Sequence, residues 1–186
     1  MRRRRRITMK KSTVTAADLA QAVRNIPDFP KPGIQFKVIT PILADADLFA
    51  GAVELLTASV VPGTVDAVVG IDARGFIFAA AAALRLRAGF VPIRKKGKLP
   101  FNTYEESYDL EYGSNTVAIH VDALKSGSRV LLVDDLLATG GTAAAAAGLV
   151  KKLGAQIVET VFLIELAFLH GRKKLTGVRV RSLISY

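Results

Sequence analysis

The run VLLVDDLLATGGT, residues 130–142, constrains the fold of this chain more than any other feature. Its first four residues, 130–133, are apolar, as in a strand buried on both faces. Small residues follow at 138–142 and predict a turn, and the Ala-rich run 143–152 predicts a helix. A strand, a turn and a helix in series indicate an α/β fold, and the backbone N–H groups of such a turn can surround an anion.

Two acids, Asp134 and Asp135, interrupt the run, and we expect the strand to end there. Carboxylates only accept hydrogen bonds, and the 2′,3′-diol of a ribose offers two donors. The sequence therefore predicts a sugar phosphate as ligand, with its phosphate in the turn and its diol on the acids. Neither a G-x-G-x-x-G nor a P-loop motif is present in this run. The alternative interpretation is that an acid caps the helix and the glycines serve only the turn.

Short apolar runs alternate with helical patterns along most of the chain. We expect strands at 66–71, 90–93, 116–121, 157–164 and 178–184, and helices at 47–60 and 75–86. This alternation predicts an α/β fold with a mostly parallel twisted sheet and helices on both faces. Near the start, Thr15 and Asp18 form a capping-box pattern, and apolar spacing extends the first helix to Ile26. No internal repeat or linker is visible, so we expect a single domain over 12–186.

Composition excludes several other classes of protein. The chain has 186 residues, of which 51% are hydrophobic, and this is enough for one well-packed core. No apolar run approaches the roughly 20 residues that cross a bilayer, so no membrane association is expected. Without cysteine, and with two separated histidines, the chain offers no disulfide, no thiolate nucleophile and no classical zinc site. We interpret His120 and His170 as structural or surface residues, and the composition fits a cytoplasmic protein.

The formal charge of +10 is concentrated at one end of the chain. Five arginines at residues 2–6 supply half of it, so the remaining residues carry +5. We expect residues 1–11 to be a disordered basic extension, with Met9 as an alternative first residue. A nucleic-acid-binding arm and part of an organellar address are the other interpretations.

Two further turns are rich in groups that bind anions. GIDARG, residues 70–75, follows an apolar strand, and its Arg74 supplies a permanent forked cation that suits a diphosphate. RKKGKLP, residues 94–100, places four cations around Gly97 at a strand end. Taken alone, the first would be an ordinary surface turn and the second a solvated or nucleic-acid-binding patch. Beside the predicted sugar-phosphate site, we interpret both as anion-binding.

A polar stretch at 95–114 is long for a compact domain, and loops of this length are often lids or binding loops. We expect a lid, part of which can form a hairpin. Within it, Glu111 is the candidate acid/base, and Tyr112 is the candidate for orienting that acid or the diphosphate. A lid that closes over a reactive sugar excludes water from it. The alternative is that both residues merely decorate a hairpin.

The signature at 130–142 resembles the phosphoribosyl-diphosphate motif of the type I phosphoribosyltransferases. PDFPKPGIQF, DARGF, RKKGKLP, LEYG and VDDLLATGGT also occur in the order seen in the adenine phosphoribosyltransferases, and the resemblance covers 17–186. It implies purine salvage, in which the 5-phosphoribosyl group of 5-phospho-α-D-ribose 1-diphosphate is transferred to adenine to give AMP and diphosphate. It also implies Mg²⁺ as cofactor, a cytoplasmic homodimer, and the type I fold with a flexible lid loop and a small base-binding hood from the N-terminal segment.

The resemblance also assigns roles to candidate site residues. It implies catalytic roles for Glu111 and Tyr112; phosphoribose binding by Asp134, Asp135, Ala138, Thr139, Gly140, Gly141 and Thr142; diphosphate binding by Asp72, Ala73, Arg74, Lys95 and Lys98; and base binding by Gln35, Phe36, Lys37 and Leu166. A cis peptide between Asp72 and Ala73 is implied as well. No residue is assigned to the metal directly, because Mg²⁺ can sit on diphosphate and sugar oxygens with little protein ligation.

Prolines and a glycine in IPDFPKPGIQF forbid a regular helix and fix an extended loop that can carry base specificity. Adenine offers a donor at its amine and an acceptor at N1, so a backbone C=O beside a backbone N–H at 35–37 can recognise it. Phe36 would stack on the base, and Leu166 would pack on its other side. A 6-oxo purine reverses that pattern, and a mispaired buried polar group costs about 1–3 kcal/mol. The family commonly has Arg-Asp where this chain has Lys37-Val38, and backbone recognition tolerates that change.

Two alternative functions stay open. The first is transfer to a 6-oxo purine, chiefly hypoxanthine or guanine. The second is a phosphoribosyl-diphosphate-sensing regulator that binds nucleic acid through the basic extension. No appended DNA-binding domain is visible in the sequence and a catalytic lid is recognisable, so nucleic acid is not expected as a partner.

Overall fold

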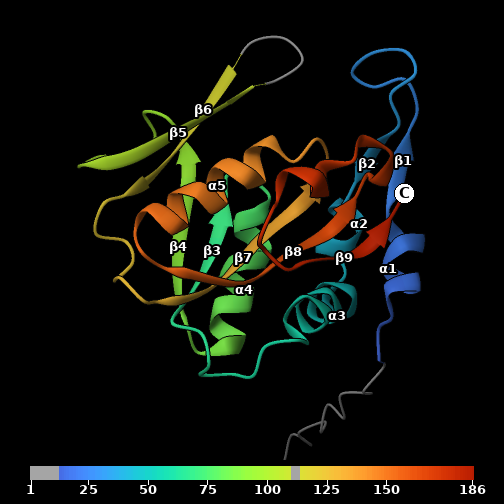
Figure 1. The fold of residues 1–186 in the computed structure, drawn as a ribbon. Helices are drawn as coiled ribbons and strands as arrows, with labels where there is room; N and C mark the ends of the chain where they lie inside the picture. The colour runs from blue at the N-terminus through green and yellow to red at the C-terminus, as the bar shows by residue number, and fades with distance from the viewer. Residues whose placement is uncertain (1–12, 110–113) are drawn as a thin grey trace, which may run out of the picture. The chain divides into compact units, whose positions relative to one another are not determined.

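The computed structural model describes residues 13–109 and 114–186, which form two compact units (Figure 1). The first unit ends at Ala52, and the second runs from Val53 to Tyr186. The single domain expected over 12–186 stays a prediction. The basic extension and the two lid residues Glu111 and Tyr112 lie outside the described residues.

The first unit combines short helices with a two-stranded sheet. Its elements are α1 (Ala16–Ala22), β1 (Arg24–Ile26), β2 (Phe36–Val38) and α2 (Thr40–Ala44), followed by α3 (Ala46–Thr57), which continues into the second unit. The predicted capping box is confirmed: the Asp18 N–H donates to Thr15 Oγ1 over 3.2 Å, and the Thr15 N–H donates to the Asp18 carboxylate over 2.8 Å.

The first helix is shorter than predicted. It ends at Ala22 because Val23 adopts an extended backbone and the next three residues pair antiparallel with β2. Arg24 lies opposite Val38, and Ile26 lies opposite Phe36. The prediction that the helix reaches Ile26 was therefore wrong, since pairing with a later segment of the chain overrides the local apolar spacing.

The second unit is built on a seven-stranded sheet with the order β5-β6-β4-β3-β7-β8-β9. The strands are β3 (Ala67–Ile71), β4 (Gly89–Lys95), β5 (Thr103–Asp109), β6 (Ser114–His120), β7 (Arg129–Leu137), β8 (Gln156–Glu165) and β9 (Val180–Ser185). Strands β4, β3, β7, β8 and β9 run parallel, and β5 and β6 form an antiparallel hairpin beside β4. The prediction of a mostly parallel sheet is confirmed, and the hairpin occupies part of the long polar stretch.

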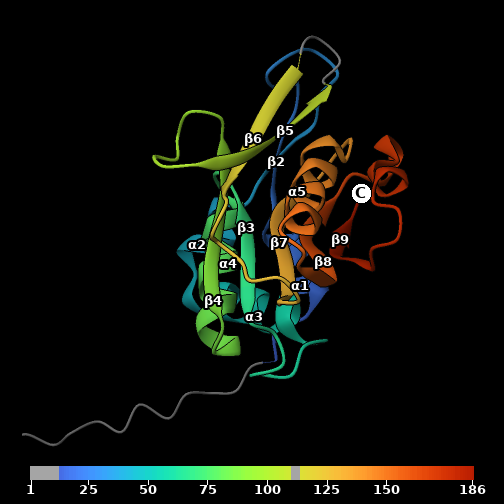
Figure 2. The same cartoon turned by 60° about the vertical axis from the view of Figure 1, so that its left-hand side comes forward.

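Helices cover both faces of this sheet, as predicted (Figures 1 and 2). They are α4 (Gly75–Leu86) on one face and α5 (Gly141–Lys152) on the other, followed by the short 3₁₀ helices η1 (Ala167–Leu169) and η2 (Gly171–Lys174). Successive strand residues point to opposite faces. Val69 packs in one buried cluster with Leu149 of α5, whereas a Cβ on Gly70 would lie 2.6 Å from the Cβ of Ala79 in α4. Among the described residues, no helix has the length and apolar character of a membrane span.

Strand β7 supports the site and extends further than predicted. Its residues 130–133 are fully buried, which confirms the two-sided burial inferred from their apolar character. The strand does not end at the acids, however: Asp134 pairs with Phe162 of β8, and Leu137 pairs with Glu165. The predicted end was wrong because the ladder to β8 uses backbone groups, which acidic side chains leave intact.

Candidate active site

Four groups of predicted site residues lie at the carboxyl ends of parallel strands. The turn at 72–74 follows β3, the turn at 95–98 follows β4, the loop at 138–140 follows β7, and Leu166 follows β8. The carboxyl ends of parallel strands share one edge of the sheet, and ligands of open α/β sheets bind at that edge. The fold therefore brings these sequence-distant groups to one edge.

The two acids of β7 differ in their surroundings. Asp135 is buried, at 6% exposed, and its Oδ2 lies 2.8 Å from Arg74 Nε. Burial raises the pKa of the Asp135 carboxyl, and the positive charge of Arg74 opposes that rise. Burial and the neighbouring Asp135 charge raise the pKa of Asp134 well above its usual range. Asp135 is consequently the more readily ionised acid of the pair.

Asp134 packs against the first turn of α4. Its Oδ1 accepts a hydrogen bond of 2.9 Å from the Asp135 N–H. A Cβ on Gly75 would lie 2.5 Å from the same oxygen and 3.2 Å from the Asp134 Cα, so only glycine allows this approach. The turn after β3 and the acids of β7 are thus held together by the Arg74–Asp135 ion pair and by the close packing of Gly75.

The loop after β7 encloses a small cavity. Gly140 has a φ of 79° and caps α5, and its carbonyl accepts the Ala144 N–H over 2.9 Å. A cavity of about 70 Å³ is lined by Asp134, residues 136–140, Thr142 and Ala143. A cavity of about 10–15 Å³ holds one water, so this one has room for a group of several heavy atoms. The predicted series of strand, turn and helix N-terminus is present in the fold.

Sequence reasoning missed the support behind this loop. A Cβ on Gly140 would overlap the Gly171 carbonyl oxygen, and a Cβ on Gly171 would overlap the Ala138 carbonyl oxygen. The next residue, Arg172, donates from Nε to both Glu165 oxygens over 2.7 and 2.8 Å, and from Nη2 to Oε2 over 2.6 Å. These bonds hold the pKa of Glu165 below its usual range. A single glycine beside an arginine gives no sequence signal for such packing.

The two diphosphate turns are linked by Arg94. The cis peptide between Asp72 and Ala73 is confirmed. Arg94 Nε donates to Asp72 Oδ2 over 3.1 Å, and Arg94 Nη1 donates to the Lys98 carbonyl over 3.2 Å. Arg94 therefore joins the turn after β3 to the turn after β4.

The remaining cations of RKKGKLP divide into two kinds. Lys96 Nζ forms an ion pair of 2.7 Å with Glu105 of the hairpin. Lys95 and Lys98 are exposed and form no ion pair with any described residue. Their backbone groups close a turn, in which the Lys98 N–H donates to the Lys95 carbonyl over 3.1 Å. These are the two lysines that the sequence predicts as diphosphate ligands.

Base-binding candidates lie in both units. In the first unit, Asn25 Nδ2 donates to Gln35 Oε1 over 2.5 Å, and the ring of Phe29 meets Phe36 edge-on at 5.3 Å between centroids. Lys37 lies in β2 beside Phe36. In the second unit, Leu166 is half-buried, and its N–H donates to the Leu137 carbonyl over 2.9 Å. The latter bond sets Leu166 beside the end of β7.

Within residues 13–109 and 114–186, no cluster of three or more histidine, aspartate or glutamate side chains can hold a metal ion. One carboxylate, that of Asp134, lines the cavity beside the predicted phosphate loop.

The family model described as "Phosphoribosyl transferase domain" matches residues 41–182. An adenine phosphoribosyltransferase of Acidothermus cellulolyticus is 57% identical over 166 residues, which are 89% of this chain and 94% of the relative. The enzyme of that name from Chloroflexus aurantiacus is 53% identical over 173 residues, covering 93% of this chain and 100% of the relative.

Solved structures give the same result. The adenine phosphoribosyltransferase of Thermoanaerobacter pseudethanolicus superposes with a TM-score of 0.88 at 49% identity, covering 92% of this chain and 100% of the other. The Saccharomyces cerevisiae enzyme, solved with an imino-altritol bisphosphate and adenine, gives a TM-score of 0.86 at 41% identity and covers 90% and 97% of the two chains.

Proposed function

The chain belongs to the phosphoribosyl transferase family and, within it, to the adenine phosphoribosyltransferases, and from that premise we propose how its residues act. The reaction is purine salvage: the 5-phosphoribosyl group of 5-phospho-α-D-ribose 1-diphosphate passes to adenine, giving AMP and diphosphate. In this proposal the carboxyl edge of the sheet in the second unit binds the phosphoribosyl donor.

One observation carries the proposal. The Arg74–Asp135 ion pair of 2.8 Å joins a turn suited to a diphosphate to a pair of acids suited to a ribose diol. One of these acids, Asp134, lines the cavity beside the loop that follows β7. Phosphate, diol and diphosphate are the three parts of the donor, and each has a complementary group on this edge. No such set of groups is needed for an ordinary helix cap.

Each part of the donor has its own residues in the proposal. Ala138, Thr139, Gly140, Gly141 and Thr142 bind the 5′-phosphate; Asp134 and Asp135 accept hydrogen bonds from the ribose hydroxyls; and Asp72, Ala73, Arg74, Lys95 and Lys98 bind the diphosphate. Negative charge grows on the diphosphate as its bond to C1 of the sugar breaks. The cations stabilise that charge, which favours the oxocarbenium character of the sugar.

The residues present fit Mg²⁺ held largely by the substrate. Asp134 and Asp135 are the carboxylates closest to where the sugar would lie, and Asp134 forms no ion pair with any described residue. Mg²⁺ typically takes one or two carboxylates together with substrate oxygens and water. When bound, the ion would neutralise charge on the diphosphate.

We assign base recognition to Gln35, Phe36 and Lys37 of the first unit and to Leu166 of the second. Backbone C=O and N–H groups at 35–37 would read the amine and N1 of adenine. Glu111, with Tyr112 beside it in sequence, would accept the proton that the purine releases as the new bond forms. Glu111→Gln is then expected to lower kcat more than substrate binding.

The experiment is a product assay on the purified full chain. With phosphoribosyl diphosphate and Mg²⁺, we expect AMP from adenine to form with a much higher kcat/KM than IMP from hypoxanthine or GMP from guanine. Preferred formation of a 6-oxo product would overturn the assignment to adenine. Tight, salt-dependent nucleic-acid binding with little turnover would favour a regulator instead.

The homodimer and the cytoplasmic location that the resemblance implies are part of the same proposal. Sedimentation velocity on the full chain measures the first. We expect a species of about twice the 19.9 kDa chain mass. A monomer that remains fully active would contradict the dimer without touching the reaction.

A further inference from the structure

A hollow of about 220 Å³ opens at the amino end of the sheet, far from the acids of the candidate active site. We call it the amino-end hollow, and Ser59, Arg129, Glu159 and Arg179 contribute to its lining. Arg129 is the first residue of β7, and Asp134 follows five residues later, roughly 16 Å along the strand. The hollow and the acids therefore lie near opposite ends of the same strand.

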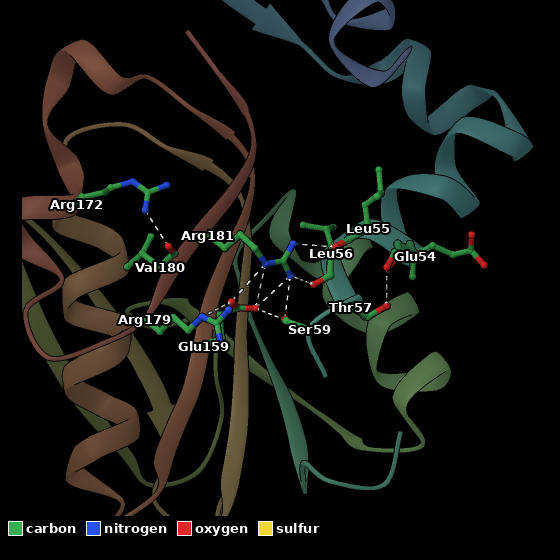
Figure 3. A network of polar contacts seen from close by, with 11 residues as sticks. Glu54, Leu55, Leu56, Thr57, Ser59, Glu159, Arg172, Arg179, Val180 and Arg181 are labelled. Atoms are coloured by element: carbon green, nitrogen blue, oxygen red, sulfur yellow. Dashed lines mark hydrogen bonds and ion pairs between the residues drawn. The ribbon is translucent and has the colours of Figure 1, made fainter. Parts of the chain in front are cut away.

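A buried carboxylate of the hollow's lining, that of Glu159, lies within a network of polar contacts (Figure 3). Glu159 is 2% exposed, and Arg181 donates to it from Nη2 over 3.1 Å and from Nε over 3.3 Å. Arg181 also donates from Nη1 to the Leu55 carbonyl over 2.9 Å and from Nη2 to the Leu56 carbonyl over 2.7 Å. Ser59 Oγ also donates to Glu159. One arginine, fixed by the end of α3, already balances the charge of Glu159.

Two further arginines make the amino-end hollow electropositive. Arg179 Nε lies 3.2 Å from Glu159 Oε1, but its side chain is 70% exposed. The Arg129 guanidinium makes no hydrogen bond or ion pair with any residue that the structure describes. The neighbouring Asp66 accepts the backbone N–H of Arg129 over 2.7 Å. Counting Arg129, Arg179 and Arg181 against Glu159 and Asp66, the formal charge remains positive.

We propose that the amino-end hollow binds a tetrahedral oxyanion, with inorganic phosphate or the phosphate group of a small ester as its natural occupant. Guanidinium forks bind such anions with paired, charge-assisted hydrogen bonds. The volume of the hollow limits the size of the ligand that it can hold. At about 220 Å³ the hollow is far larger than a water site and smaller than the roughly 300–1,000 Å³ of pockets for drug-sized ligands. A phosphate or small phosphate ester fits these limits better than a nucleotide.

Bound phosphate would add a link between β7 and β9, which lie on either side of β8 in the sheet. Arg129 begins β7, and Arg179 immediately precedes β9. The Arg179 carbonyl accepts a hydrogen bond of 2.8 Å from the Thr160 N–H of β8. An anion held by both guanidiniums would bridge the amino ends of β7 and β9. This inference does not depend on the proposed reaction, which uses the other end of the sheet.

The test must separate this hollow from the phosphate loop of the active site, and NMR of arginine side chains does so. Inorganic phosphate is titrated into the ¹⁵N-labelled full chain at constant ionic strength while the Nε–Hε signals are followed. We expect the signals of Arg129 and Arg179 to move together along one saturable curve. In Arg129→Gln and in Arg179→Gln, the Kd from the remaining signal should rise about ten- to hundredfold, as expected when a charged hydrogen bond is lost.

Arg87→Gln is the matched control, because Arg87 is an exposed arginine at the end of α4 and outside the hollow. It removes the same charge and should leave the Kd unchanged. Arg129→Gln removes no described side-chain contact, so it keeps the fold and tests the charge alone. Phosphoribosyl transfer should be unaffected in all three variants.

A parallel titration with glycerol phosphate identifies the source of the anion. Equal binding would indicate the phosphate end of a small ester, and binding of inorganic phosphate alone would indicate the free ion. Shifts that grow linearly without saturation, or a Kd that changes no more in Arg129→Gln and Arg179→Gln than in Arg87→Gln, would overturn the proposal.

Discussion

Asp134 and Asp135 are neighbours in one strand, but the charged groups around each carboxyl differ, and so does the ease with which each carboxyl ionises. Asp135 has Arg74 at 2.8 Å, whereas Asp134 faces the charge of Asp135 within a buried site. A carboxyl whose pKa is raised on folding binds its proton more tightly in the native than in the unfolded chain. Such a group makes the native state less stable as pH rises above its unfolded pKa, until the pH passes its native pKa. The proposed sugar site is therefore kept at a cost in stability.

Asp134→Asn tests this opposition between stability and function. The amide is isosteric and keeps the oxygen that accepts the Asp135 N–H. We expect a higher Tm than in the native chain at pH 8, with a gain that shrinks towards pH 5. Each 1 kcal/mol corresponds to about 2–4 °C in a chain of this size. KM for phosphoribosyl diphosphate should rise about tenfold or more, because a charged acceptor for the diol is lost. A lower Tm at pH 8 or unchanged kinetics would contradict this account.

Arg74→Ala examines the other side of the ion pair. The variant removes a cation from the turn after β3 and leaves Asp135 buried without its partner. Because the Arg74 side chain is 40% exposed, the loss of stability should be modest, about 1 kcal/mol. Initial-rate kinetics should show a raised KM for phosphoribosyl diphosphate and a lower kcat, with KM for adenine little changed. A selective loss of adenine affinity would count against the diphosphate role.

At the scale of helices and strands, the boundaries were predicted well where they depend on the local sequence. α4 was predicted at 75–86 and is observed there, because a turn precedes it and Arg87 ends it in the left-handed conformation. β3, β8 and β9 follow their apolar runs within one or two residues at most ends. The helix predicted at 47–60 ends three residues early, at Thr57. The other errors occur where distant segments pair: β1 with β2, and β7 with β8 beyond the acids. The links from Arg181 to Leu55 and from Arg172 to Glu165 have no local pattern at all.

The element η2 gives a prediction about the phosphate loop. Gly171 packs against Ala138 and Gly140, and the next residue, Arg172, is bound to Glu165. Arg172 also donates to the Val180 carbonyl over 2.8 Å (Figure 3). In Arg172→Met we expect the loop to loosen, so that KM for phosphoribosyl diphosphate rises severalfold while kcat stays within about twofold. Lys173→Met, one residue along and without an ion pair among the described residues, should leave both constants unchanged.

The same ion pair predicts a pH dependence of stability. Arg172 lowers the pKa of Glu165, so the pair contributes stability above the unfolded pKa of the carboxyl and loses it as the pH falls through the lowered native pKa. The difference in Tm between the native chain and Arg172→Met should thus be full at neutral pH and shrink on acidification below pH 4. A difference independent of pH would show that packing of the arginine, rather than its charge, holds η2.

Two glycine substitutions separate close packing from backbone freedom. Gly171→Ala would place a methyl group on the Ala138 carbonyl, so we expect a displaced phosphate loop and weaker binding of phosphoribosyl diphosphate. In Gly148→Ala the new methyl group meets only Glu106, at 3.9 Å, within helix α5. That variant should gain about 0.5–1 kcal/mol of stability and keep its affinity. Thermal melts and substrate titrations of both proteins make the comparison.

At the scale of the whole molecule, the positive charges form separate groups. Some lie at the two proposed anion sites, and others lie in the basic extension. The carboxyl edge of the sheet combines cations with two acids, and the amino-end hollow adds arginines around one buried acid. Residues 2–6 hold five of the ten net positive charges in sequence alone. The order of the strands in the sheet decides which residues meet at each of these two sites. This order depends on which segments pair, so local apolar runs in the sequence could not predict it.

Deleting residues 1–8, so that the chain starts at Met9, tests this separation. The formal net charge falls from +10 to +5, and we expect kcat and both KM values to stay the same. The affinity for double-stranded DNA is measured at several salt concentrations. The slope of log K against log salt concentration should become shallower by up to about 4–5, because each lost phosphate contact contributes about 0.9. Arg→Gln changes at the five positions should match the deletion, since the charge is what attracts the phosphates. A fall in turnover with the deletion would instead make the extension part of the enzyme, and an unchanged slope would place the nucleic-acid affinity on the folded units.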